Sequence, residues 1–142
     1  MQKIIQFSID HIFLLIVWLI TFSILIFTVL QKFFSKAKEI SKNEAIYLIN
    51  RKKAVVLDLR NASEYKSGHI INSINIEAKN IKIENINFLK KFKNYPIIVV
   101  GITEIYAYYP AKKLFKLGFD KIYILKEGIS GWIRENLPIV KK

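Results

Sequence analysis

The chain has 142 residues, of which 52% are hydrophobic and 24% charged, and its formal net charge is +12. This length allows one compact domain, and the absence of cysteine excludes disulfides, thiolate zinc sites and any covalent mechanism through a thiol. Positive charge favours anionic partners, but lysine, isoleucine and asparagine are abundant throughout the chain, which favours compositional bias over a selected basic surface.

An uncharged apolar run covers residues 12–30, after a short N-terminal segment at 1–11. A helix of this length spans about 28 Å, close to the hydrocarbon thickness of a bilayer. A cleaved signal peptide is the main alternative, but this run is longer than such segments usually are and no small-residue cleavage site follows it. A domain this small could not surround the helix as a core. We therefore predict one transmembrane helix at 12–30.

Lysines set the predicted orientation of this helix. Lys32, Lys36 and Lys38 follow the apolar run, whereas Lys3 before it is offset by Asp10. Basic residues are retained on the cytoplasmic side of a membrane. We expect a single-pass protein of the inner (plasma) membrane with its N-terminus outside and its C-terminal domain in the cytoplasm, joined by a basic connector at residues 31–40.

Residues 41–142 have the pattern of one α/β domain. Ser41 and Glu44 have the spacing of a capping box, which predicts a helix to about Asn50. Apolar, β-branched runs predict buried strands at 54–59, 97–100 and 121–125 and a shorter one at 74–76, and helices are expected at 61–66, 86–92, 107–117 and 129–135. This alternation predicts a mostly parallel sheet flanked by helices.

Ligands of open parallel sheets bind beyond the carboxyl ends of the strands. Two loops qualify: residues 60–70 follow the first predicted strand, and residues 101–106 follow the strand at 97–100.

Motifs in these segments resemble the rhodanese family. Its pattern D-x-R…E-[FY]…G-H-I…[AS]-x-[NH]-[IL] is matched from residue 58 to residue 76, and its closing signature by residues 127–132 with 137–139. The residues that carry the match are Asp58, Arg60, Glu64, Gly68, His69, Gly128 and Trp132. Several motifs in the correct order over about residues 41–140 imply the rhodanese-like fold.

The resemblance implies an altered active-site loop. Rhodanese domains transfer sulfane sulfur through a cysteine that begins a six-residue loop, and here that position is Gly101. Glu104 stands where many members have glycine, and Tyr106 where an arginine often closes the anion cradle. The degenerate loop comprises Gly101, Ile102, Thr103, Glu104, Ile105 and Tyr106. Loss of the nucleophile and gain of a carboxylate imply an inactive domain with no catalytic residue.

Other polar residues favour structural roles. Asp58 and Arg60 are expected to form a pair that stabilises the fold, and His69 is expected to be structural rather than a general base. For Tyr106, Tyr108 and Tyr109, packing beneath the loop and recognition of a partner are equally favoured. Pro110 is expected in the first turn of its helix.

The leading functional prediction is a membrane-anchored protein-interaction module, whose partners are the lipid bilayer and another inner-membrane protein. The alternative is a sulfurtransferase-related enzyme with residual or lost handling of sulfane sulfur or anions. A third interpretation is association with anionic lipid headgroups or RNA by charge, without a specific nucleic-acid motif. No metal and no cofactor are predicted.

Overall fold

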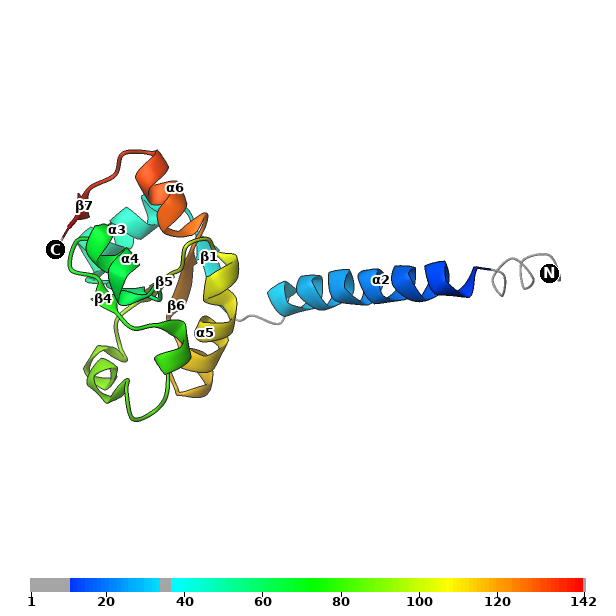
Figure 1. Ribbon diagram of the computed structural model, residues 1–142. Coiled ribbons are helices and arrows are strands. Elements are labelled where there is room, and N and C mark those ends of the chain that lie inside the picture. Colours follow the sequence, from blue (N-terminus) through cyan, green and yellow to red (C-terminus); the bar gives the residue numbers. More distant parts are fainter. Residues whose placement is uncertain (1–10, 34–36, 142) are drawn as a thin grey trace. The chain divides into compact units, whose positions relative to one another are not determined.

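The computed structural model describes residues 11–33 and 37–141 of the chain (Figure 1). It divides into two units, one up to Phe34 and the other from Ser35 onward. Residues 1–10 of the predicted N-terminal segment, residues 34–36 of the predicted connector and residue 142 lie outside the described residues.

The described residues of the first unit form one helix, α2 (Ile12–Phe33), in which residues 12–30 are long and apolar enough to cross a membrane. A signal sequence near an N-terminus has the same character. The hydroxyl of Thr21 donates to the carbonyl of Val17, and that of Thr28 to Leu25, both at 2.8 Å. These bonds satisfy the hydroxyl groups of the two threonines, which lowers the cost of placing them in an apolar surrounding.

The second unit contains a five-stranded parallel sheet in the order β1-β6-β5-β2-β4. Its strands are β1 (Lys38–Ile40), β2 (Val55–Asp58), β4 (Ile74–Asn75), β5 (Ile97–Val100) and β6 (Ile122–Leu125). All four residues of β5 are buried, as expected for a central strand covered on both faces. A small antiparallel pair joins β3 (His69–Ile70) to β7 (Ile139–Val140). The mostly parallel α/β sheet that the sequence predicted is confirmed.

Alternate residues of the strands supply two separate cores. Ile97 and Val99 pack with α5 (Ile105–Lys116) and with the 3-10 helix η2 (Asn87–Phe92) on one face of the sheet. Ile98 and Val100 pack with α3 (Lys42–Lys52) and α6 (Gly128–Arg134) on the other. The sheet therefore separates two layers of helices. The short helices α4 (Ala62–Ser67) and η1 (Ala78–Asn80) lie in the connections around β3 and β4.

Three details differ from the sequence prediction. The last three residues of the predicted connector form β1, the edge strand, which pairs in register with β6. Residues 87–92 form a 3-10 helix instead of an α-helix. Helix α5 begins at Ile105 rather than near Ala107, so Pro110 lies inside the helix, beyond its first turn. Because proline has no N–H, α5 lacks one internal hydrogen bond there.

Candidate functional site

The candidate loop, Gly101–Tyr106, connects the end of β5 to the first turn of α5. Its first residue is buried, Thr103 and Glu104 are half-buried, and Ile102, Ile105 and Tyr106 are exposed. The loop therefore lies at the carboxyl edge of the sheet, where the sequence predicted it, and α5 includes its last two residues.

The start of α6 binds the first two carbonyl groups of this loop. The N–H of Ile129 donates to the carbonyl of Gly101 at 3.0 Å, and the N–H and hydroxyl of Ser130 donate to Ile102 at 3.2 and 2.9 Å. These contacts satisfy backbone N–H groups in the first turn of α6, which have no acceptor within the helix. The loop thus presents carbonyl oxygens to α6, and the N–H groups of Ile129 and Ser130 are used within the protein.

Close approach of the two segments requires glycine at position 128. Gly128 has φ +55°, and a Cβ atom there would lie 2.6 Å from the carbonyl oxygens of both Gly101 and Ile102. A side chain would therefore push the loop away from α6. Gly128 was predicted from the resemblance as a fold-signature residue, and this contact gives it a physical role.

Gly101 has no space for a side chain either. A Cβ atom at this position would lie 2.8 Å from the carbonyl oxygen of Thr103 and 3.0 Å from Cβ of Tyr106. The first of these contacts involves backbone, which does not yield as a flexible side chain does. The loop is folded around a glycine, and a thiol at position 101 would require it to rearrange.

A hollow of about 170 Å³ lies beside the loop and is lined by Leu59, Arg60, Asn61, Glu64, Ala78, Gly101, Ile102 and Tyr106. Its volume is below the range of about 300–1,000 Å³ that is typical of ligand pockets. Glu64 contributes a carboxylate, which accepts a hydrogen bond from the N–H of Asn61. Negative charge in so small a space works against binding an anionic substrate.

The one guanidinium group at this hollow, that of Arg60, is engaged elsewhere. Its Nε and Nη2 atoms donate to the carboxylate of Asp58 at 3.0 and 2.8 Å, and Nη2 also donates to the carbonyl of Gly68 at 2.7 Å. Asp58 is only 1% exposed. The buried, charge-assisted pair joins the end of β2 to the chain just before β3. Both residues lie where the sequence predicted a structural pair.

His69 is held in a structural setting. Its Nδ1 atom lies 2.7 Å from the carbonyl oxygen of Tyr65, and because a carbonyl only accepts, Nδ1 carries the proton. The ring stacks on that of Tyr65 with centroids 3.8 Å apart, and the Tyr65 hydroxyl donates to the carbonyl of Ser73. The imidazole therefore ties α4 to β3.

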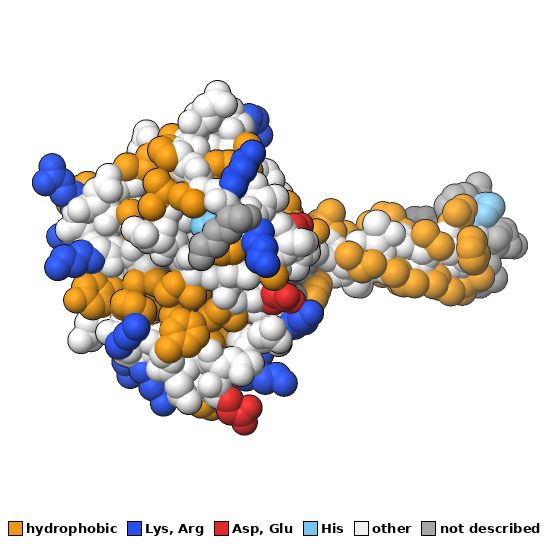
Figure 2. Space-filling model, turned by 60° about the vertical axis from the view of Figure 1, so that its left-hand side comes forward, with side chains coloured by type: hydrophobic (Ala, Val, Ile, Leu, Met, Phe, Trp, Pro, Cys, Tyr) orange, Lys and Arg blue, Asp and Glu red, His pale blue; other side chains and the backbone are white. Residues whose placement is uncertain are grey.

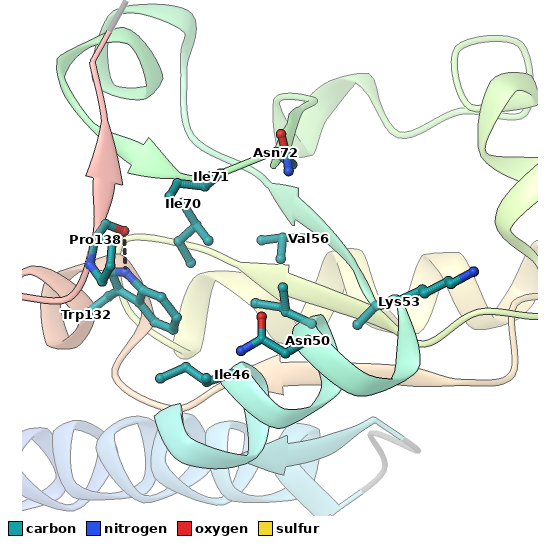
Figure 3. Close-up of a pocket in the computed structure, with 11 residues that line it drawn as sticks. Ile46, Asn50, Lys53, Val56, Ile70, Ile71, Asn72, Trp132 and Pro138 are labelled. Carbon is teal, nitrogen blue, oxygen red and sulfur yellow. Dashed lines mark hydrogen bonds between the residues drawn. The ribbon is translucent and has the colours of Figure 1, made fainter.

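Trp132 is a buried residue of α6, and its Nε1–H donates to the carbonyl of Pro138 at 3.1 Å. It also lines a larger hollow of about 460 Å³ (Figure 3). Figure 3 shows the side chains of Ile46, Val56 and Ile70 around this space, with Asn50 and Lys53 on α3 and its C-cap. The lining is mainly aliphatic and holds no pair of groups suited to acid–base chemistry.

The three tyrosines near the loop divide between two roles. Tyr108 packs against the core, whereas Tyr106 and Tyr109 are 63% and 68% exposed. Ile105 is 71% exposed beside them, and Ile102 also reaches solvent. Positions 105, 106 and 109 lie on one face of α5 by helical spacing. Together with the exposed Ile102 on the preceding loop, these residues form what we call the loop face.

Sequence reasoning missed a charged cluster behind the loop. The carboxylate of Glu127 pairs with Lys42 at 3.3 Å and with Arg134 at 2.5 Å, and Lys42 also pairs with Glu135. The hydrogen bond from Lys42 is the main cause that lowers the pKa of Glu127, and the bond to Glu135 is the main cause that raises the pKa of Lys42. No short motif joins these positions, since the fold brings α3 to α6. Among the described residues, no group of three His, Asp or Glu side chains could hold a metal ion.

Comparison with known proteins gives a family match over the second unit. The family described as "Rhodanese-like domain" matches residues 41–135. The protein YibN of Escherichia coli (strain K12), described as uncharacterized, is 41% identical over 141 residues, which cover 99% of each chain. The thiosulfate sulfurtransferase GlpE of Shewanella oneidensis is 27% identical over 103 residues, covering 72% of this chain and 98% of GlpE.

A solved structure supports the same fold. The BH2092 protein of Bacillus halodurans superposes with a TM-score of 0.64 at 27% identity, covering 78% of this chain and 80% of its own. Together with the parallel sheet and the family match, this likeness confirms the resemblance inferred from the motifs.

Proposed function

The chain belongs to the rhodanese-like domain family, and from this premise we propose that it is a catalytically inactive member, anchored in the inner membrane, whose domain binds another protein at the cytoplasmic face. The observation that carries the proposal is the exposed apolar loop face, built on a loop that has glycine where the family uses cysteine.

Four features support the loss of sulfur transfer. The chain has no thiol to carry a sulfane sulfur. The loop carbonyls of Gly101 and Ile102 bind the start of α6, and the Glu104 carboxylate adds negative charge where an anionic substrate would approach. The Nε and Nη2 atoms of Arg60 already donate to Asp58 and to the carbonyl of Gly68.

The loop face supports recognition of a protein. Exposed isoleucine and tyrosine side chains on adjacent turns provide apolar area together with hydroxyl groups, the combination that is enriched where proteins bind one another. Tyr106 replaces the arginine of the anion cradle, so the change that removes anion binding also adds aromatic surface.

The partner we propose is a protein of the same membrane. Helix α2 provides the anchor, and only residues 34–36 separate it from the first described residue of the domain. The excess of lysine after the apolar run supports a cytoplasmic domain. A tether this short keeps the domain close to the bilayer, where membrane proteins are concentrated.

The test is photo-crosslinking of the full chain in its native membrane. A benzophenone amino acid is placed at Tyr106 or Tyr109, and at Tyr47 as a control, because Tyr47 is exposed to a similar extent on α3. Thr21 tests recognition within the membrane. We expect one reproducible protein adduct at positions 106 and 109 that is absent at 47. Identical adducts at all three tyrosines, or none at positions 106 and 109, would exclude the loop face as a binding surface.

Relatives described as thiosulfate sulfurtransferases suggest the competing function. The purified chain is expected to form no thiocyanate from thiosulfate and cyanide. Thiocyanate formation above the uncatalysed rate would instead establish residual enzymatic activity.

A further inference from the structure

One end of the domain is formed by the connections that lead into the parallel strands. Residues 51–54, 90–96 and 116–121 precede β2, β5 and β6, so they meet at the amino edge of the sheet. Hydrogen bonds join them: Val55 N–H donates to the carbonyl of Pro96, Ile97 N–H to that of Lys121, and the Lys121 ammonium to that of Asn94. They form one continuous surface, which we call the basic edge.

The basic edge carries eight exposed cations: Arg51, Lys52, Lys53, Lys90, Lys91, Lys93, Lys116 and Lys121. None of the eight forms an ion pair within residues 11–33 and 37–141. Asp120 lies within residues 116–121 of this edge, and Glu84 follows Ile83, which lines a hollow beside Lys90 and Lys116. Like charges gathered on one surface repel one another, so this arrangement favours an anionic partner that neutralises them.

The opposite edge of the sheet is different, because its acidic groups are paired. Glu127 and Glu135 bind Lys42, Glu77 binds Lys79, and the carboxylates of Glu44, Glu64 and Glu104 accept backbone hydrogen bonds. The excess of lysine and arginine over acidic side chains is also visible on the face shown in Figure 2. Compositional bias explains the number of lysines but not this asymmetry.

Helix stabilisation explains only part of the basic edge. Arg51 and Lys52 lie in the last turn of α3 and Lys116 in that of α5, where cations interact favourably with the helix dipole. Lys93 and Lys121 lie outside any helix. The remaining three are the C-cap residue of α3 and two residues of the six-residue η2, whose dipole is small.

Exposed apolar side chains lie beside the lysines of the basic edge. Ile83 is 61% exposed, and Phe88 and Tyr95 are also exposed. A hollow of about 410 Å³ is lined by Ile83, Ile86, Leu117 and Phe119, with Lys90 and Lys116 beside them. Lysines around aliphatic and aromatic side chains are typical of surfaces that rest in the headgroup region of a bilayer. A nucleic acid would leave the aliphatic hollow unused.

The chain also enters the domain at this edge. Strand β1 runs parallel to β6 with Lys38 opposite Tyr123, so its amino end faces the same way as the basic edge. The step from Phe33, the last residue of α2, to Ala37 spans about 14 Å at most when the chain is fully extended. A bilayer crossed by α2 is therefore within reach of the basic edge.

We propose that the basic edge lies on anionic phospholipid headgroups, so that the loop face at the opposite edge points into the cytoplasm. This inference rests on the proposed membrane anchoring by α2 and deepens it, because it fixes the orientation of the domain. A protein that binds the loop face must then extend a segment beyond the headgroups to reach it.

The test uses the absence of cysteine, which makes a single introduced thiol a unique labelling site. The full chain carries a fluorophore at Asn94→Cys on the basic edge or at Lys126→Cys, directly after β6 on the opposite edge. Each protein is placed in nanodiscs that contain headgroup-spin-labelled lipid. The discs are made of phosphatidylcholine alone or of equal parts phosphatidylcholine and phosphatidylglycerol.

We expect the label at position 94 to be strongly quenched in the anionic discs, and less in neutral discs or at high salt, where charge interactions are screened. The label at position 126 should be quenched weakly in every case. Equal quenching at the two positions, or equal quenching at position 94 in the two lipids, would overturn the proposal.

A matched pair of variants tests the charges themselves. Neutralising Lys90, Lys91, Lys93 and Lys121 with glutamine should reduce quenching at position 94 to its level in neutral discs. The same change at Lys66, Lys79, Lys126 and Lys141 removes equal charge elsewhere and should leave the quenching at position 94 unchanged. An equal loss of quenching in both variants would overturn the proposal. Retention of the chain in the discs tests membrane anchoring by α2, and crosslinking at Tyr106 tests partner binding by the loop face. Each of these proposals can therefore fail independently of lipid binding by the basic edge.

Discussion

The carboxylate of Glu104 accepts a hydrogen bond of 2.9 Å from the backbone N–H of Glu127. This bond links the loop after β5 to the turn before α6, where Glu127 has a left-handed backbone with φ +63°. A residue that looks like an obstacle to anion binding therefore has a structural function. Glu104 helps to hold the loop in the conformation that exposes the loop face.

Replacement of Glu104 by alanine is expected to destabilise the domain by about 1–2 kcal/mol, because the N–H of Glu127 loses its acceptor. Glu104→Gln keeps an acceptor oxygen and should recover most of that loss. Urea unfolding of the full chain in detergent measures both variants. If glutamine is as destabilising as alanine, the carboxylate charge matters more than the hydrogen bond.

Gly101→Cys is expected to create no thiosulfate sulfurtransferase and to destabilise the domain by about 1–3 kcal/mol, since the new Cβ would lie 2.8 Å from the carbonyl oxygen of Thr103. Thiocyanate formation and the urea midpoint are measured together. Ser63→Cys, at an exposed position on α4, is the control for an added thiol. Activity in the Gly101→Cys variant alone would show that the loop relaxes around a side chain.

Asp58→Asn is expected to cost about 3–5 kcal/mol, because the guanidinium of Arg60 would remain buried without a counter-charge. Lys79→Gln breaks the exposed pair with Glu77 and should change stability by less than about 1 kcal/mol. Unfolding by urea compares the two. A small effect of Asp58→Asn would mean that the carbonyl of Gly68 suffices to hold the arginine.

Lys42→Gln is expected to change how stability depends on pH. The pKa of Glu127 is lowered below its ordinary value of 4.5, chiefly by the hydrogen bond from Lys42, so the paired carboxylate stabilises the fold above that value and the gain is lost as pH falls. The pKa of Lys42 is raised above 10.5, chiefly by Glu135, so its contribution is present below that value and is lost as pH rises further.

The thermal midpoint of Lys42→Gln should therefore lie below that of the unmodified chain between about pH 5 and pH 10, and the two should converge in stronger acid. Arg134 and Lys126 also act on Glu127 and remain in the variant. Lys52→Gln, at the exposed end of the same helix, is the control. A difference in thermal midpoint that does not change with pH would show that Lys42 does not stabilise the fold through its charge.

Local patterns in the sequence were sufficient to predict most of the fold. Ser41 and Glu44 form the predicted capping box, and the apolar runs became the buried strands β2, β5 and β6. Strand β1 was missed because Lys-Glu-Ile has no strand pattern of its own and is ordered only by pairing with β6. The first turn of α5 was missed because exposed residues at its start resemble a loop.

The candidate site was predictable in its position but not in its geometry. Motif order placed Gly101 at the head of the loop. The bonds from Ile129 and Ser130 to that loop, and the exposure of Tyr106 but not of Tyr108, depend on how α6 and α5 pack. Such contacts join residues that are far apart in the chain, so no short sequence pattern reports them.

The pairing of β1 also sets an order of events during synthesis. Helix α2 and β1 leave the ribosome first, but the partner of β1 is β6, which is made more than eighty residues later. Until then the three residues of β1 have no strand to join, and the amide of Lys126 has not yet reached the carbonyl of Ile40. With α2 in the membrane, as proposed above, the nascent chain would be held there before its sheet can be completed, because β1 cannot pair until β6 has been made.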